Sequence, residues 1–223
     1  MRSTFEISAN RSHRFGGHGR PFAILWAAAF LLASVFCVSA HAQTDLNGEN
    51  KSITPPTDGA DWSTSFTNTS ENLSTITFSG LASGTRYDFT KTLTGNIHVD
   101  VTHQGYANNE NRFTFSNAGN TFTGGVTMRE GILFVTNANQ VPSFAGGLTL
   151  ENTVIMNSAE ATFNNSLYIP EGKFAGLRSS TNLTYAGEIS GSGDLVIVTE
   201  NKNKVTLTGT NNTYSGVTSI GTV

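Results

Sequence analysis

The segment Phe122-Thr123-Gly124-Gly125-Val126-Thr127-Met128 determines the architecture, because it recurs further along as Phe144-Ala145-Gly146-Gly147-Leu148-Thr149-Leu150. A looser copy, FNNSLYI, follows at 163–169. In each copy, apolar residues alternate with other residues shortly after a glycine or asparagine pair, which is typical of a short strand that follows a turn. A period of about 20 residues indicates stacked units, each of which buries its apolar face only against its neighbours.

Stacking of these copies predicts where each side chain lies. Three pairs of apolar residues should point inward and form columns: Val126 and Met128, Leu148 and Leu150, Leu167 and Ile169. Their neighbours should face water: Thr127, Thr149 and Tyr168. The glycine pairs should supply corners with positive φ, and asparagines should cap corners through bonds from side chain to backbone. We therefore predict an all-β fold, a right-handed parallel β-helix with coils of roughly 20 residues and about seven or eight rungs.

Residues 1–42 have the composition of a secretory signal. Residues 1–20 carry four arginines and a single acid, and an apolar run covers 21–38. Ala40-His41-Ala42 then provides an A-x-A cleavage motif. This order of segments predicts a signal peptide over 1–42 that is cleaved before Gln43. A membrane anchor is the alternative, but the apolar run is close to the lower limit of about 17 residues for a spanning helix.

The composition of residues 43–223 restricts the possible partners. Cys37 is the only cysteine, so the mature chain has no disulfide and depends on packing for its stability. Residues 43–223 hold 9 Lys and Arg against 15 Asp and Glu, a net charge of 9 − 15 = −6. Nucleic acids and anionic membranes need clustered cations, so we expect neither as a partner. Thr, Asn and Gly are the most frequent residues of this segment, which favours regular β-structure over an average enzyme domain.

Three segments follow from these patterns. After the signal peptide, residues 43–61 contain few apolar residues and a Pro55-Pro56 break, so we expect a flexible leader without secondary structure. From residue 62 to 223, short runs rich in Val, Ile, Phe and Thr alternate with Gly and Asn, which predicts the β-helix repeat region. The repeat region ends in the middle of a repeat.

Two stretches resemble a known repeat family. NTFTGGVTMREGIL at 120–133 fits a pattern of the form N-T-Y-T-G-G-T-T-I-x-x-G-T-L, with Phe122 in place of Tyr and Met128 in place of Ile. The stretch 183–223 contains YAGEISGSGDL and then VTLTGTNNTYSG, whose NTYSG at 212–216 echoes NTFTG at 120–124. In this order the two stretches resemble the autotransporter-associated β-strand repeat, also called the passenger-associated transport repeat.

The resemblance implies a function outside the cell. Members of the family are β-helical passengers of large surface or secreted proteins in diderm bacteria, where the repeat is thought to help the passenger emerge and fold. It implies an exported structural chain, surface-bound or secreted, which acts as a scaffold or adhesin. Its expected partners are the export machinery, surface glycans or a host or neighbouring cell surface. No segment resembles a translocator barrel, so an outer-membrane translocator would act in trans.

Two clusters of polar residues are candidate metal sites. His98, Asp100 and His103 form H-x-D-x-x-H, in which the first two should share a strand face and a turn at Gly105 could return the third. Glu130, Glu151 and Glu171 recur at intervals close to the coil period, which would suit a cation such as calcium if they stacked. We expect solvated polar residues in both cases, because no fourth ligand is evident for the first and like charges repel in the second.

The remaining candidates also have plain structural explanations. Several T-x-T pairs could form a flat array for ice or a crystalline glycan, but their spacings do not repeat at the coil period: Thr67 and Thr69, Thr75 and Thr77, Thr121 and Thr123, Thr206 and Thr208. Trp62 could stack on a sugar, but a cap on the first coil is the simpler interpretation. A β-helical polysaccharide-degrading enzyme would need converging acids and cations, whereas Arg129, Lys173, Arg178, Lys202 and Lys204 are scattered. We expect no enzyme, no cofactor and no catalytic or metal-binding residue, with a glycan- or ligand-binding module as the alternative function.

Overall fold

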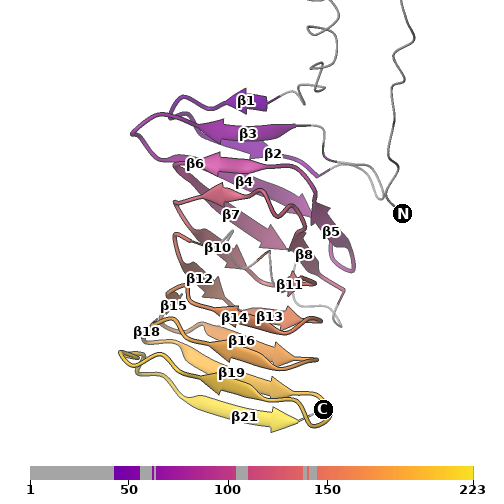
Figure 1. The fold of residues 1–223 in the computed structure, drawn as a ribbon, viewed down its shortest axis with the longest axis vertical. Coiled ribbons are helices and arrows are strands. Elements are labelled where there is room, and N and C mark those ends of the chain that lie inside the picture. The colour runs from indigo at the N-terminus through magenta and orange to yellow at the C-terminus, as the bar shows by residue number, and fades with distance from the viewer. Residues whose placement is uncertain are drawn as a thin grey trace, which may run out of the picture. The chain divides into compact units, whose positions relative to one another are not determined.

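The structure, a computed structural model, describes residues 43–55, 62, 64–103, 110–137, 140 and 145–222. They form a parallel β-solenoid of about 7 turns with almost no helix, and its strands stack one above the other in chain order (Figure 1). The predicted signal peptide at 1–42 lies outside the described residues.

Four sheets run along the solenoid. Sheet A contains β1 (Gln43–Asp45), β3 (Ser65–Asn68), β6 (Leu93–Gly95) and β9 (Thr121–Phe122). Sheet B contains β2 (Lys51–Ile53), β4 (Ser74–Leu81), β7 (Ile97–His103), β10 (Val126–Arg129), β12 (Leu148–Glu151), β15 (Leu167–Ile169) and β18 (Ile189–Gly191). Sheet C contains β5 (Arg86–Phe89), β8 (Arg112–Phe115), β11 (Ile132–Val135), β13 (Thr153–Asn157), β16 (Phe174–Ser179), β19 (Asp194–Thr199) and β21 (Thr218–Thr222). Sheet D contains β14 (Ala161–Phe163), β17 (Leu183–Tyr185) and β20 (Val205–Leu207).

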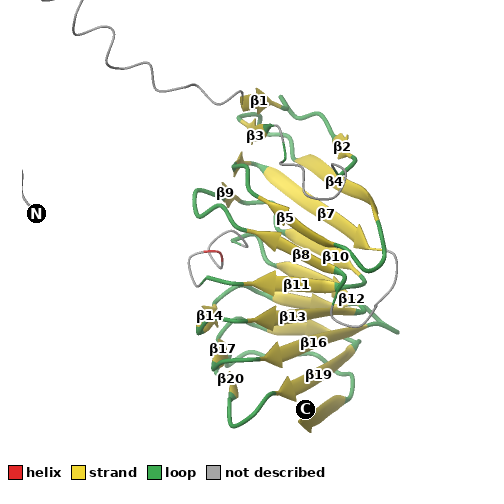
Figure 2. Ribbon diagram, turned by 90° about the vertical axis from the view of Figure 1, so that its right-hand side faces the viewer, coloured by secondary structure: helices red, strands yellow, loops and turns green. Residues whose placement is uncertain are grey.

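Most coils among the described residues visit the sheets in the same order. A strand of sheet A or D is followed by sheet B and then by sheet C, as in β6, β7 and β8 or in β14, β15 and β16. Sheets A and D therefore occupy the same place in the coil, and Figure 2 shows β9, β14, β17 and β20 along one side of the solenoid. We call their common outer surface the A/D face.

The distance in sequence between paired residues gives the length of each coil. Thr67 pairs with Thr94, so one coil of the N-terminal half extends from 67 to 94. Val126 pairs with Leu148 and Leu148 pairs with Leu167, so the coils further along are shorter and extend from 126 to 148 and from 148 to 167. The strands β10, β12 and β15, which belong to the three copies of the sequence repeat, thus stack directly on one another.

The inward columns predicted from this repeat are confirmed. The six apolar residues of β10, β12 and β15 are all buried: Val126, Met128, Leu148, Leu150, Leu167 and Ile169. On the outer side, Tyr168 is 49% exposed and Thr149 is partly exposed. Thr127 differs from the prediction, because it is buried and its hydroxyl lies 3.1 Å from Nε2 of His98 on the neighbouring coil.

The longer N-terminal coils enclose a core rich in aromatic rings. The ring of Trp62 is buried edge-on against Phe78, at 5.2 Å between centroids, and against Phe89, at 5.3 Å. Phe113 and Phe115 continue this cluster. A longer coil encloses a wider cross-section, and large rings fill it to the density that protein interiors need. Trp62 therefore packs on the first coils, but as part of the buried core and not as the predicted cap.

Residues 43–53 differ from the expected flexible leader. β1 pairs in parallel with β3 and β2 pairs in parallel with β4, so both segments belong to the sheets. Leu46, which lies between them, is buried in the core. The segment was missed because its strands are very short and gain their order from hydrogen bonds to the next coil.

Glycines and asparagines shape the corners, as the sequence predicts. Gly125 and Gly147 have φ values of 83° and 87°, where a side chain would be strained. Oδ1 of Asn120 accepts a hydrogen bond of 2.7 Å from the Leu93 amide, and its Nδ2 donates to the carbonyl of Asn117. Asn212, at the start of the later NTYSG copy, makes the same two bonds, with the Ile189 amide at 2.9 Å. The repeated letters therefore mark a repeated cap.

Candidate functional site

The H-x-D-x-x-H cluster does not assemble into one site. His98 and Asp100 lie on the outer face of β7, whereas His103 is buried at the end of the strand. Nδ1 of His98 lies 2.8 Å from the carbonyl oxygen of Gly124, and Asp100 forms an ion pair with Arg129. Strand alternation explains the outcome, because residues separated by an odd number point to opposite faces. The turn considered at Gly105 lies outside the described residues.

His103 is a buried imidazole. Neither ring nitrogen has a hydrogen-bond partner among the described residues, and the ring packs 5.8 Å from the ring of Tyr87. Burial lowers the pKa of His103 to about 4, and the nearby main chain of Arg112 opposes this shift without forming a well-aligned hydrogen bond. The side chain is therefore neutral at physiological pH and is part of the core.

The three glutamates do not stack on one another. Arg129 of β10 pairs in register with Glu151 of β12, and their side chains form an ion pair at 3.3 Å. Glu130 instead occupies the following turn with a φ of 60°, and Glu171 is exposed in a turn before β16. In the part of the chain that the structure describes, no three His, Cys, Asp or Glu residues gather closely enough to hold a metal ion.

The scattered cations take structural positions. Arg178 forms an ion pair with Glu200 at 2.6 Å. Lys202 and Lys204 flank Asn203, whose Nδ2 donates a hydrogen bond of 2.7 Å to the carbonyl of Ser180, so this segment is a corner, as the sequence suggests.

Threonines form columns on the A/D face that are not evident from the sequence. Thr67, Thr94 and Thr121 are register partners on β3, β6 and β9. The hydroxyl of Thr94 donates to that of Thr67 at 2.9 Å. On sheet D, the register partners on β14, β17 and β20 form a second column: Thr162, Thr184 and Thr206. The columns take single threonines and not the T-x-T pairs, since Thr75 and Thr77 pair with His98 and Asp100 on the next coil.

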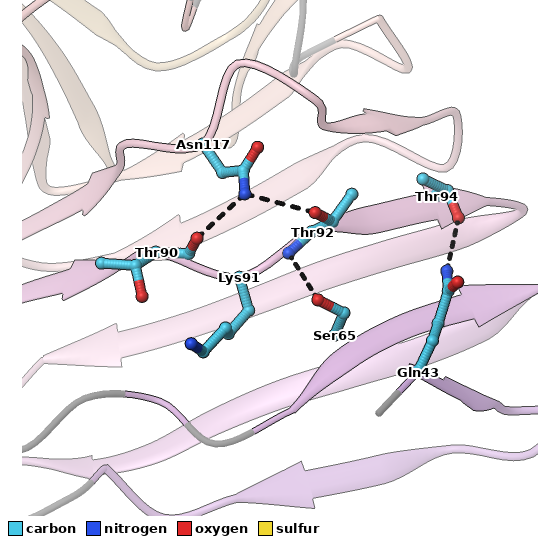
Figure 3. Close-up of a pocket in the computed structure, with 7 residues that line it drawn as sticks. All are labelled: Gln43, Ser65, Thr90, Lys91, Thr92, Thr94 and Asn117. Atoms are coloured by element: carbon cyan, nitrogen blue, oxygen red, sulfur yellow. Dashed lines mark hydrogen bonds between the residues drawn. The ribbon is translucent and has the colours of Figure 1, made fainter. Parts of the chain in front are cut away.

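A polar groove of about 420 Å³, which we call groove A, opens on the first column (Figure 3). Its walls come from successive coils: Gln43 of β1, Ser65 of β3, Thr94 of β6, the loop Thr90–Thr92 and Asn117. Lys91 supplies the only charge among these lining residues.

Hydrogen bonds between coils hold the polar groups of groove A in place. Nδ2 of Asn117 donates to the Thr90 carbonyl at 2.9 Å and to the Thr92 hydroxyl at 3.2 Å (Figure 3). The amide of Thr92 donates to Oγ of Ser65 at 3.1 Å. The groove is therefore preorganised by the stacking itself.

A second groove of about 340 Å³, groove D, opens on the other column. Thr162 and Thr184 line it together with Glu160, Ala161 and Asn182. Nδ2 of Asn182 donates to the Glu160 carboxylate at 3.0 Å. Both grooves thus combine threonine hydroxyls with an asparagine amide and one charged side chain.

Comparisons with known proteins identify no relative. No protein family, no curated protein and no solved structure matches this chain. Among the described residues, no helix is long and apolar enough to cross a membrane. The class of protein established by the fold is a parallel β-solenoid.

Proposed function

We propose that this chain is an exported structural β-solenoid, similar to an autotransporter passenger, that serves as a scaffold at the cell surface or after secretion. The observation that carries the proposal is the match between motif and coil. The stretch 120–133, which carries the family resemblance, spans β9, β10 and the start of β11, so one motif corresponds to one pass over all three faces. Crossovers between parallel strands are right-handed in nearly all proteins, so we propose a right-handed coil.

The proposed mechanism is mechanical. Each coil buries its apolar column against its neighbours and has no separate core, so folding can advance coil by coil as chain emerges from a translocator. Disulfides are not required for this process, which suits passage through a narrow export channel. The proposal includes the export machinery and an outer-membrane translocator in trans as partners, and it assigns no catalytic residue.

Expression of the full chain in a diderm bacterium tests the export step. We expect the product outside the inner membrane with Gln43 as its first residue, as determined by intact mass. A variant that lacks the segment 2–42 should stay in the cytoplasm. A full-length product that keeps Met1 and remains in the cytoplasm would rule out the proposed export.

A further inference from the structure

We propose that a second copy of this chain pairs with the free edge of β21, so that two solenoids join about a two-fold axis. Among the described residues, β21 is the outermost strand of sheet C, and only β19 pairs with it. Figure 1 shows β21 at the opposite end of the stack from β1. This inference goes beyond the scaffold function and does not rest on export, because it follows from the chemistry of the last described rung.

The last described rung leaves apolar side chains open to water. Ile220 pairs in register with Ile197 and continues the inward column of sheet C, but it is 77% exposed. Val205, Leu207 and Tyr214, which precede β21, pack against the core and remain partly exposed. A coil of a solenoid buries its apolar side chains only against neighbouring coils, so a matching apolar end of a second copy would cover them favourably.

Hydrogen bonds hold β21 in place before a second copy arrives. The hydroxyl of Tyr214 lies 2.7 Å from the hydroxyl of Thr218. The amide of Val217 donates a hydrogen bond of 2.8 Å to the carboxylate of Asp194 on the previous rung. An edge that is already ordered loses less entropy when another strand pairs with it.

The edge of β21 carries no device against strand pairing. Its sequence, Thr-Ser-Ile-Gly-Thr, has no charge and no proline, and all five residues are exposed. By contrast, β2 at the N-terminal edge of sheet B carries Lys51 at an inward position, in register with the buried Ile76. Strand β5 at the N-terminal edge of sheet C carries Arg86 and Asp88. Charges on edge strands oppose pairing, so β21 should pair with its own copy and not with the N-terminal strands.

A two-fold axis through Ile220 gives a consistent register. Two copies of one edge strand related by such an axis run antiparallel. Ile220 then lies opposite Ile220 of the second copy, and Thr218 lies opposite Thr222 of the second copy. Thr218 and Ile220 pair in register with the buried Leu195 and Ile197, so inward side chains meet inward side chains. These are all β-branched pairs, which stabilise antiparallel neighbours.

Sedimentation velocity of the full-length Cys37→Ser protein over a concentration series tests the association. We expect a reversible equilibrium between monomer and dimer. Ile220→Lys places an inward-pointing charge on each edge and should raise the dissociation constant at least about tenfold. Ile220 is largely exposed, so the variant should fold, which circular dichroism checks. Tyr168→Lys on the outer side of sheet B replaces another exposed apolar residue and should leave the dimer unchanged.

Oxidative cross-linking between copies tests the register. Residues directly opposite each other in an antiparallel pair have Cα atoms about 4.5–5.5 Å apart, within reach of a disulfide. Ile220→Cys in the Cys37→Ser protein should therefore give a disulfide-linked dimer. Ser219→Cys lies opposite Gly221 of the second copy, so its counterpart is displaced by about 6.8 Å along the strand and it should remain reduced.

Each of the other outcomes would overturn part of the proposal. A protein that stays monomeric at every concentration would rule out the association. Equal association of the parent and Ile220→Lys would remove the contact from β21 and place it elsewhere, such as the apolar run at 21–38. Oligomers that keep growing with concentration would replace the two-fold axis with head-to-tail stacking. Equal cross-linking of Ser219→Cys and Ile220→Cys would overturn the register.

Discussion

At the scale of single residues, corner geometry depends on a few backbone positions that only glycine can occupy. Gly125 combines a φ of 83° with close packing, because an added Cβ would lie 2.6 Å from the carbonyl oxygen of Gly146 on the next coil. Gly172 has a φ of 68° but open space around the same position. A comparison of Gly125 with Gly172 therefore separates the cost of backbone strain from the cost of a steric clash between coils.

We predict that Gly125→Ala lowers the free energy of unfolding by about 2–5 kcal/mol, since it adds left-handed strain and a clash between coils. Gly172→Ala should cost only the strain, about 1–2 kcal/mol. Urea denaturation followed by far-UV circular dichroism measures both changes. Equal losses would contradict the close stacking of the coils at Gly125.

The buried imidazole of His103 predicts a loss of stability in acid. Its pKa is about 4 in the folded chain and near 6.5 when unfolded, so the unfolded state binds more protons between these values. The contribution of His103 to stability is complete above pH 6.5 and decreases as the pH falls to 4, by at most about 3 kcal/mol.

Replacement His103→Phe should remove this part of the pH dependence, because phenylalanine fills the site without titrating. His98→Gln on the outer face is the control and should keep it. Melting temperatures measured from pH 7 to pH 4 give the result. Parallel pH profiles for the parent and His103→Phe would show that His103 is not buried as described.

At the scale of the strand and its corner, a single asparagine cap is used twice. Asn120 and Asn212 make equivalent bonds, but Asn120 is only 2% exposed, whereas Asn212 is exposed. Removal of the buried Asn120 side chain leaves the Leu93 backbone amide without an acceptor, which is costly. Water can take the place of the exposed Asn212 side chain and accept from the Ile189 amide.

We therefore predict that Asn120→Ala lowers the free energy of unfolding by about 1–3 kcal/mol and that Asn212→Ala has a smaller effect, below about 1 kcal/mol. Asn120→Asp keeps the acceptor for the Leu93 amide but sets a buried carboxylate oxygen against the Asn117 carbonyl, so it should not restore the stability that Asn120→Ala loses. The order of the three urea midpoints is the readout. A larger loss at Asn212 than at Asn120 would show that burial does not govern the value of this cap.

The strands also show how far sequence reasoning reaches. The columns through Val126, Leu148 and Leu167 were predictable, because their alignment is marked by the repeated glycine or asparagine pair. The longer N-terminal coils lack this marker, so Thr94 was not connected with Thr67 and Thr121, and the threonine column was missed. Grooves A and D were also missed, since their walls join residues from successive coils whose register the sequence does not state.

At the scale of the whole molecule, the register between successive coils determines every other feature of the structure. The core columns, the corner caps and both grooves exist only if each coil lies over the correct residues of the previous one. Thr149 pairs with Tyr168, and Tyr168 pairs with Ser190, on the outer side of sheet B. Register partners on neighbouring parallel strands lie about 4.8 Å apart, which is within the Cα separation of about 4.4–6.8 Å that a disulfide needs. Residues two rungs apart are too distant to form a disulfide.

Cysteine cross-linking in the full chain with Cys37→Ser measures this register directly. Oxidation of Thr149→Cys combined with Tyr168→Cys should give an intrachain disulfide, detected by peptide mass mapping. Thr149→Cys combined with Ser190→Cys should remain reduced under the same conditions. Efficient cross-linking of the second pair, or failure of the first, would contradict the stacked parallel solenoid.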